Sequence, residues 1–282
     1  MLGVSKTSRY IAHAVLILGV LIVAFPIYYT FVASTHSLQT ILRPPLPLLP
    51  GDRFFENYYQ ALFGGVRQTG GVGADLLLFN TTVMALGIAV GKIAISLLSA
   101  YAIVFFRFPG RMLFFWLIFI TLMLPVEVRI LPTYKVMVDL GLINTYAGLI
   151  IPLIASATAT LLFRTFFLTI PGELVEAARV DGAGPWRFFK DILLPLSKTN
   201  LAALFVIMFI YGWTQYLWPL LITTSNDMNT IVIALRRMIS FADAETQWHI
   251  VMVTAILAML PPVAVVVFMQ RWFVKGLVET EK

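Results

Sequence analysis

Six long apolar segments constrain the fold of this chain more than any other feature of its sequence. A helix needs about 20 mostly apolar residues to cross the roughly 30 Å hydrocarbon core of a bilayer. The segments that qualify are Tyr10–Ala33, Leu76–Phe106, Met112–Leu131, Tyr146–Thr169, Leu201–Thr223 and Ile250–Gln270. Because unpaired backbone groups are costly in lipid, each segment is expected to be helical. The sequence therefore predicts an all-α, polytopic membrane protein with six transmembrane helices.

The composition favours one membrane domain. Hydrophobic residues make up 60% of the 282 residues and charged residues only 12%, whereas an ordinary soluble domain has about 25% charged residues. The apolar segments run nearly from end to end, which predicts a single transmembrane domain over residues 1–282, with membrane lipid as its solvent. The first segment is too long for a cleavable signal peptide, and no small-residue cleavage pattern follows it.

Several kinds of chemistry find no support in the sequence. The chain has no cysteine, which excludes disulfides, thiolate metal sites and cysteine nucleophiles. Its histidines, His13, His36 and His249, are scattered, so no metal site is predicted. The stretch nearest to a nucleotide-binding loop, Gly87–Ile93, has the wrong spacing and lies within the second apolar segment. No catalytic residue or cofactor is predicted. The net charge of +6 comes without a basic run, so nucleic-acid binding is not expected.

The distribution of Lys and Arg predicts the orientation, because cytoplasmic loops carry an excess of these residues. With the N-terminus inside, the cytoplasmic set is Lys6, Arg9, Arg107, Arg111, Arg179, Arg187, Lys190, Lys198, Arg271, Lys275 and Lys282. The external set is smaller: Arg43, Arg53, Arg67, Lys135, Arg236 and Arg237. Both termini are therefore predicted to lie in the cytoplasm.

Two external loops follow from this orientation. The first, Thr35–Ala74, contains a proline run and several glycines and is expected to be irregular, with one short helix over Asn57–Leu62. The last, Thr224–His249, is polar and is expected to carry a short helix over Ile231–Met238.

The cytoplasmic loop Pro171–Lys198, PGELVEAARVDGAGPWRFFKDILLPLSK, begins with a predicted short helix. Pro171 suits the first turn of a helix, and acidic Glu173 is favoured near its N-terminus. Glu176 and Arg179 are three residues apart and are expected to pair. Gly182 can adopt the left-handed conformation that ends a helix.

A second short helix is predicted from Pro185, and Pro195 is expected to break it before the fifth span. Its apolar side carries Trp186, Phe188, Phe189 and Ile192. An exposed aromatic cluster is typical of a partner surface. The alternative is a helical hairpin that lies on the membrane, with Arg179, Arg187 and Lys190 among the lipid headgroups.

The loop resembles the EAA loop of permease subunits of bacterial ABC importers. That pattern reads E-A-A, two residues, D-G-A, then an aromatic residue, an isoleucine and L-P. The matching residues are Glu176-Ala177-Ala178, Asp181-Gly182-Ala183, Phe189, Ile192 and Leu194-Pro195. The resemblance implies a MetI-like ABC permease fold whose coupling helix seats in a groove of a cytoplasmic ATPase. It assigns that contact to Glu176, Ala177, Ala178, Asp181 and Gly182.

The same resemblance implies partners and a location. Six spans make only half a pore, so a homologous second permease subunit is expected, together with two cytoplasmic ATPase subunits and an external solute-binding protein. ATP and magnesium would be bound by the ATPase, and this chain would not itself be an enzyme. The location implied is the inner (plasma) membrane of a bacterium.

Further stretches resemble carbohydrate-uptake permeases of the maltose-transporter kind. MLPVEVRILP, ASATAT, FFKDILLPLSKTNLAALFV and MQRWFVKGLVETEK are most similar to the branch that takes up sn-glycerol-3-phosphate. Thr214 stands where the family usually has an asparagine, so no polar contact is assigned to it. A sugar or oligosaccharide is the alternative solute. The alternative of another class is a secondary transporter or channel without an ATPase, although such proteins usually show internal repeats and no clear repeat relates the two halves.

Four charged residues lie within or at the edges of the predicted spans: Lys92, Glu127, Arg129 and Arg164. A charge at the bilayer centre costs about 2.5–3.5 kcal/mol on insertion scales, so each needs a partner, water or a route to the surface. Arg164 is expected to snorkel to the inner surface. Lys92, nearest mid-span, is either a structural residue or a cationic wall of the translocation path. Because a glycerol phosphate is anionic, Lys92, Arg129 and Glu127 are candidates for the substrate path.

Overall fold

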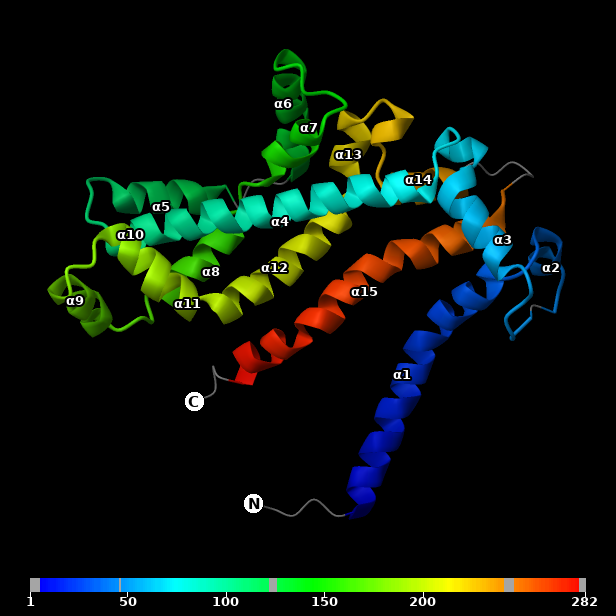
Figure 1. Ribbon diagram of the computed structural model, residues 1–282, viewed down its shortest axis with the longest axis horizontal. Coiled ribbons are helices and arrows are strands. Elements are labelled where there is room, and N and C mark those ends of the chain that lie inside the picture. The colour runs from blue at the N-terminus through cyan, green and yellow to red at the C-terminus, as the bar shows by residue number, and fades with distance from the viewer. Residues whose placement is uncertain (1–5, 46, 122–125, 241–245, 279–282) are drawn as a thin grey trace. The chain divides into compact units, whose positions relative to one another are not determined.

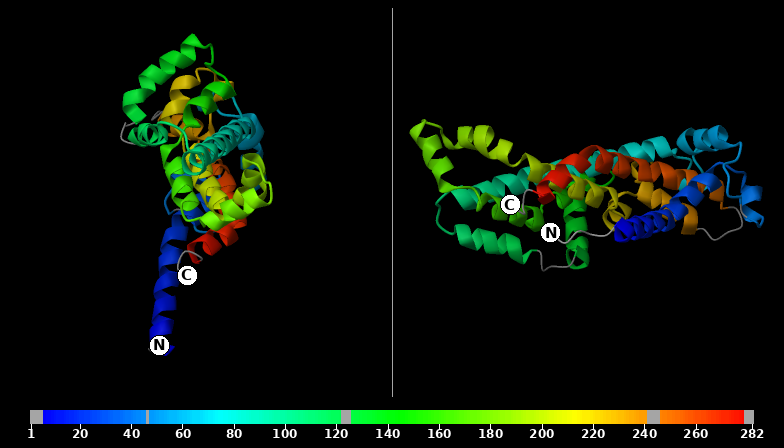
Figure 2. Two further views of the ribbon diagram at one scale, coloured as in Figure 1. Left: turned by 90° about the vertical axis from the view of Figure 1, so that its left-hand side faces the viewer. Right: turned by 90° about the horizontal axis from the view of Figure 1, so that it is seen from below.

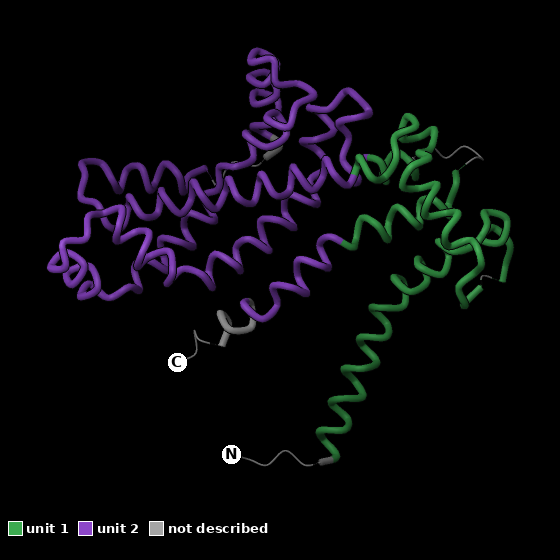
Figure 3. The backbone as a smooth tube through the Cα atoms, viewed as in Figure 1, with its two compact units in different colours: residues 1–77, 234–260 green, residues 78–233, 261–282 purple. Residues whose placement is uncertain are grey.

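The computed structural model describes residues 6–45, 47–121, 126–240 and 246–278, and these residues contain helices and no strand (Figure 1). The predicted all-α class is confirmed. The chain divides into two compact units, coloured separately in Figure 3. Unit 1 comprises residues 1–77 and 234–260, and unit 2 comprises residues 78–233 and 261–282.

Unit 1 contains the first predicted span, α1 (Lys6–Ser34), whose apolar sequence explains a helix of this length. Only 6% of its most apolar window is buried, so its sides are left for lipid and neighbouring chains. The loop that follows is not structureless. It contains α2 (Leu38–Leu42), α3 (Phe54–Tyr59), the π-helical turn η1 (Gln60–Gly64) and the 3-10 turn η2 (Arg67–Thr69).

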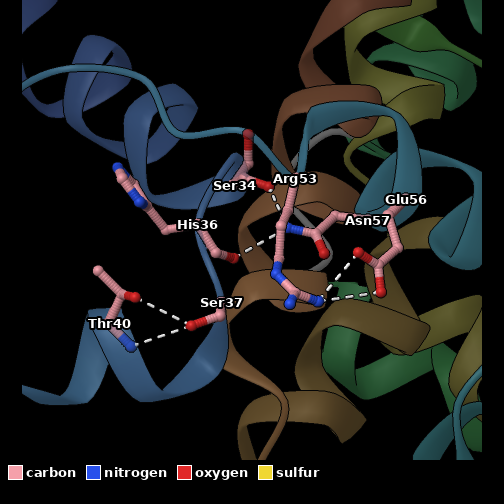
Figure 4. Close-up of polar contacts among 7 residues, drawn as sticks. All are labelled: Ser34, His36, Ser37, Thr40, Arg53, Glu56 and Asn57. Atoms are coloured by element: carbon pink, nitrogen blue, oxygen red, sulfur yellow. Dashed lines mark hydrogen bonds and ion pairs between the residues drawn. The ribbon is translucent and has the colours of Figure 1, made fainter.

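Side-chain hydrogen bonds hold this loop against the end of α1 (Figure 4). The buried amide of Asn57 donates to the carbonyl oxygens of Ser34, at 2.8 Å, and His36, at 2.9 Å. Arg53 and Glu56 form an ion pair of 2.9 Å at the start of α3. The short helix predicted over Asn57–Leu62 is therefore present as α3 and η1, and it begins three residues earlier than predicted.

Unit 2 is organised around α4 (Ala74–Phe105), which begins in unit 1. Its other elements are α5 (Arg111–Ile120), α6 (Val126–Asp139), α7 (Tyr146–Ile150), η3 (Ile151–Leu153), α8 (Ala157–Phe167), α9 (Gly172–Val180), α10 (Pro185–Phe188), η4 (Phe189–Leu193), α11 (Leu194–Leu196), α12 (Lys198–Trp213), α13 (Leu217–Ile222) and η5 (Asn226–Met228). Two further helices have residues in both units, α14 (Ile231–Ser240) and α15 (Trp248–Val278). The helix predicted over Ile231–Met238 is thus confirmed.

Small residues allow α4 to approach its neighbours closely, as is common between membrane helices. A Cβ added at Gly91 would lie 2.5 Å from a methyl carbon of Ile154, and one added at Gly212 of α12 would lie 2.9 Å from the Cα of Ala85. Gly87 is similarly close to Ile150. The glycines of Gly87–Ile93 therefore serve helix packing.

The number of spans is not confirmed as six. Among the described residues, three helices are long and apolar enough to cross a membrane: Thr7–Ser34, Ala74–Phe105 and Trp248–Trp272. Two bent pairs raise the number to five if each pair is one span, Tyr146–Leu153 with Ala157–Phe167 at 49° and Pro185–Leu196 with Lys198–Trp213 at 73°. The predicted third span corresponds to the ten-residue α5 and the beginning of α6, with residues 122–125 outside the described residues.

Candidate functional site

The first part of the candidate coupling loop is a helix followed by a left-handed glycine. Helix α9 ends at Val180 with Asp181 as its C-cap residue, and Gly182 has a φ of +72°. The amide of Ala183 donates to the carbonyl of Ala178 at 2.8 Å and closes the turn. This confirms the left-handed conformation that was predicted for Gly182 at the end of the helix. Pro171 precedes α9 as its N-terminal cap residue and does not lie in its first turn, a shift of one position from the prediction.

The predicted ATPase-contact residues differ in exposure. Ala178 is buried, with 4% of its surface exposed, whereas Glu176, Ala177, Asp181 and Gly182 are exposed. The exposed residues therefore form a surface on α9 and its turn, while the buried alanine packs inward.

The predicted pairing of Glu176 with Arg179 is wrong. In the described part of the loop the ion pair is between Arg187 and Asp191, at 3.5 Å. Both Glu176 and Arg179 are exposed, and an exposed pair gains too little in water to hold two long side chains together.

The helical structure in the second part of the loop extends past Pro195, further than predicted. Pro195 lies in the first turn of α11, where its missing N–H costs no hydrogen bond. The break comes instead at Ser197, whose hydroxyl donates to the carbonyl of Leu193 at 2.6 Å, before the chain bends by 73° into α12. The predicted aromatic cluster is only partly exposed, because Trp186 is 68% exposed whereas Phe188 and Phe189 are buried.

Buried aromatic rings attach this loop to α4. The Tyr101 ring lies 5.0 Å from the Phe189 ring, and the Phe105 ring lies 5.3 Å from the Phe188 ring, measured between centroids. The hydroxyl of Tyr101 donates to the carbonyl of Pro185 at 2.7 Å. Figures 1 and 2 place α9 at one end of unit 2, beyond the C-terminal end of α4. A displacement of α10 and η4 would therefore act directly on α4.

Of the three candidate substrate-path residues, the structure describes the side chains of Lys92 and Arg129. Lys92 is only 6% exposed, and its ammonium lies 3.6 Å from the centroid of the Tyr211 ring, a cation–π contact between α4 and α12. Arg129 is exposed and lines a cavity of about 120 Å³ with Gln215. Its charge lies within electrostatic range of both Lys92 and Tyr211. The side chain of Glu127 lies outside the described residues.

Sequence reasoning missed Tyr211 and Gln215 as neighbours of the two cations. Both lie in the stretch YGWTQYLWPLLI, where polar atoms in an apolar segment were the available signal. The amide of Gln215 donates to the carbonyl of Tyr211 at 3.1 Å and so lies across the end of α12. Thr214 donates to the carbonyl of Ile210 at 2.9 Å within the same helix end. Its hydroxyl thus serves the helix terminus.

The expectation that Arg164 snorkels to the inner surface stays a prediction, and the structure shows an aromatic contact for this side chain. Its guanidinium carbon lies 4.2 Å from the centroid of the Phe115 ring, so α8 and α5 share a cation–π contact. The Nε atom of Arg164 is buried and has no hydrogen-bond partner among the described residues. The aromatic ring therefore takes the place of water for part of this side chain.

Comparison with known sequences supports the transport interpretation. Residues 92–279 match the family described as "Binding-protein-dependent transport system inner membrane component". A protein of Rhizobium meliloti (strain 1021) named "sn-glycerol-3-phosphate transport system permease protein UgpE" is 74% identical over 275 residues, 98% of each chain. Proteins of the same name from Brucella melitensis and Yersinia enterocolitica are 71% and 58% identical, over 100% and 96% of each chain. The similarity therefore extends over the whole length of the chain.

A solved structure has the same fold. A chain from the "Crystal structure of a bacterial ABC transporter involved in the import of the acidic polysaccharide alginate" matches with a TM-score of 0.82 and 24% identity. The match covers 97% of this chain and 100% of that chain. At 24% identity, this similarity shows that the two chains share an arrangement of helices.

Proposed function

Because this chain belongs to the family of binding-protein-dependent transport system inner membrane components, we propose that it is one permease subunit of an ATP-driven importer of sn-glycerol-3-phosphate or a related glycerophosphodiester. The subunit role rests on one structural observation above all, an exposed helix α9 followed by α10 and η4, whose buried rings Phe188 and Phe189 pack on α4. The choice of solute rests on the names of relatives that are 58% to 74% identical to this chain.

The working complex contains this chain, a second homologous permease, two ATPase subunits and an external solute-binding protein. Both termini lie in the cytoplasm, which the distribution of Lys and Arg supports. ATP is hydrolysed on the ATPase subunits, and this chain carries force. The exposed residues Glu176, Ala177, Asp181 and Gly182 supply the surface that an ATPase groove would hold.

Transport proceeds by alternating access. When the ATPase subunits close on ATP, they draw the α9 helices of the two permeases together. The movement of α9 passes through the turn at Gly182 to α10 and η4, and it reaches α4 because Tyr101 hydrogen-bonds to Pro185 and its ring packs on Phe189. Helix α4 also carries Lys92, so the same movement changes the surroundings of that cation.

Lys92 and Arg129 attract the anionic end of the solute. A glycerol phosphate carries up to two negative charges, and a dry apolar path would exclude it. Arg129 is accessible and can bind a phosphate with two parallel hydrogen bonds. Lys92 lies deeper, with its ammonium over the Tyr211 ring.

Reconstituted transport tests the proposal as a whole. The complex of two permeases and two ATPases is placed in proteoliposomes with the binding protein outside and ATP inside. Uptake of labelled sn-glycerol-3-phosphate is expected to require ATP and to resist excess maltose. Uptake without ATP would point to a secondary transporter, and competition by maltose to a sugar importer.

Charge removal tests the path. Lys92→Met and Arg129→Met are each expected to raise the KM for sn-glycerol-3-phosphate about tenfold, since a hydrogen bond to a charged group contributes about 1.5–3 kcal/mol. Lys135→Met is the matched control, because Lys135 lies on the same helix as Arg129 and is also exposed, but it is paired with Asp139. Unchanged KM values in both test variants would remove these residues from the path.

A further inference from the structure

A cavity on the loop-bearing end of unit 2 lies apart from the exposed residues of the proposed coupling contact. It has a volume of about 560 Å³ and lies between the end of α4 and the loop formed by α9 and α10. From α9 it is lined by Val175, Ala178 and Arg179, which are spaced at i, i+3 and i+4 and so share one face of the helix. Of the residues predicted to contact the ATPase, the buried Ala178 lines it, whereas the exposed Glu176, Ala177, Asp181 and Gly182 do not.

Two arginines line this cavity, Arg107 after α4 and Arg179 of α9. Among the described residues neither arginine has a carboxylate within ion-pair distance, whereas Arg187 of the same loop is paired with Asp191. Two unopposed positive charges at one cavity favour an anionic occupant. The planar guanidinium is well matched to phosphate, which it can bind with two parallel hydrogen bonds.

The remaining wall is apolar and aromatic. Phe105, Phe106 and Phe188 line the cavity, and Phe106 is 39% exposed at the point where the apolar part of α4 ends. Aromatic residues at the end of a span are typical of the lipid headgroup level. The hydroxyl of Tyr101 is already engaged with Pro185, so the arginines are the polar groups left for a ligand.

We propose that this cavity binds the phosphate of an anionic phospholipid of the inner leaflet, held between Arg107 and Arg179, with its acyl chains beside Phe106. The apolar wall favours a lipid over free phosphate, which would leave that wall unused. Basic pockets at the cytoplasmic ends of membrane helices are suited to such headgroups. The bound lipid would join α4 to the back of α9, so the anionic lipid content of the membrane would influence coupling. This site rests on the orientation given in the proposed function.

Lipid binding to the whole complex tests the site directly. The detergent-solubilised complex of permeases and ATPases is titrated with phosphatidylglycerol or phosphatidylcholine, and bound lipid is counted by native mass spectrometry. The wild-type complex is expected to prefer phosphatidylglycerol. Arg107→Gln with Arg179→Gln should weaken this binding about 30-fold, since a basic side chain near an anionic membrane surface contributes about 1 kcal/mol. Binding is measured without ATP or solute, so a complex that fails to transport still reports on the site.

Two further variants separate the site from general effects. Arg187→Gln, in the same loop but already paired, is expected to bind phosphatidylglycerol as the wild type does. Arg107→Lys with Arg179→Lys retains both charges and should retain most of the binding, which excludes misfolding as the cause of a loss. Undiminished phosphatidylglycerol binding by the double glutamine variant would overturn the proposal. Displacement of the lipid by millimolar inorganic phosphate would also overturn it, in favour of a soluble anion.

Discussion

At the scale of single residues, Asn80 shows how α4 tolerates a polar side chain in an apolar helix. It is fully buried, and its amide donates to the carbonyl oxygens of Asp227, at 2.7 Å, and Asn229, at 3.0 Å. The hydroxyl of Tyr146 donates to its side-chain oxygen at 2.7 Å. Asn80 therefore satisfies three polar groups from two other segments of unit 2.

Replacing Asn80 with an apolar residue should lower the stability of the protein, because its three hydrogen bonds would be lost. Asn80→Leu would leave a hydroxyl and two carbonyl groups without their partner, and each unsatisfied buried group costs about 1–3 kcal/mol. We expect a loss of stability of about 3 kcal/mol, seen as a lower thermal unfolding midpoint of the purified complex. Thr82→Val on the same helix removes only a bond to the carbonyl of Leu78 and should change the midpoint little. Equal midpoints for the two variants would show that water replaces the lost contacts.

Gly182 and Gly184 form a matched pair for testing the turn after α9. A Cβ at either position would meet no atom within 4 Å, but only Gly182 has a positive φ, +72°, whereas Gly184 has a φ of −68°. Gly182→Ala should therefore cost about 1 kcal/mol or more of backbone strain, and Gly184→Ala almost none. We expect only Gly182→Ala to raise the ATP hydrolysed per solute transported, measured in proteoliposomes. A similar rise for Gly184→Ala would mean that the left-handed conformation is not what the turn requires.

The left-handed glycine could be predicted because few residue types tolerate that conformation. The partner of Lys92 could not. Lys92 and Tyr211 are more than a hundred positions apart in the chain, and a buried lysine can reach water, a carboxylate or a ring. Hydropathy shows that such a charge needs a partner and gives no information about which one.

At the scale of helices, the packing of α4 against η3 and the residue after it depends on Gly91. Gly91→Val would place side-chain atoms where Ile154 now lies, since even a Cβ comes within 2.5 Å of it. Overpacking of this kind costs about 1–3 kcal/mol. We expect a lower unfolding midpoint that is partly restored by adding Ile154→Ala, which provides the missing volume. Gly19→Val in α1, where nothing lies within 4 Å of the added Cβ, is the control. If Ile154→Ala gave no restoration, the contact would not limit stability.

The helical character of the apolar segments was predictable, but their continuity was not. A 20-residue hydropathy window averages over a bend, so Tyr146–Thr169 gave the same signal as a straight helix although the chain breaks by 49° within it. Similarly, α12 ends at Trp213, ten residues before the predicted end of its segment, and α13 follows as a separate helix. The breaks occur where Ser156 caps α8 and where Thr214 and Gln215 bond to the end of α12. These are local hydrogen bonds that an average does not detect.

At the scale of the whole molecule, composition predicted a membrane domain, whereas the EAA-like pattern predicted the family of permeases to which the chain belongs. Hydropathy alone left open whether Pro171–Lys198 binds a partner or lies on the membrane. The structure adds that Glu176 and Ala177 are exposed and do not line the cavity, whereas Val175, Ala178 and Arg179 of the same helix line it. One face can therefore contact an ATPase while the other contacts lipid, so both readings can apply to different faces of one helix.

The predicted orientation can be tested on the intact protein because the chain has no cysteine. Ala177→Cys in α9 and Leu49→Cys in the first external loop each introduce a single thiol at an exposed position. A membrane-impermeant maleimide is expected to label Leu49→Cys in spheroplasts and Ala177→Cys only in inside-out vesicles prepared without the ATPase. Adding the ATPase should protect Ala177→Cys, since α9 would then be covered, and should leave Leu49→Cys unchanged. Labelling of Ala177→Cys from the outside would place α9 where no ATPase can reach it, and force from ATP hydrolysis could then not enter through this loop.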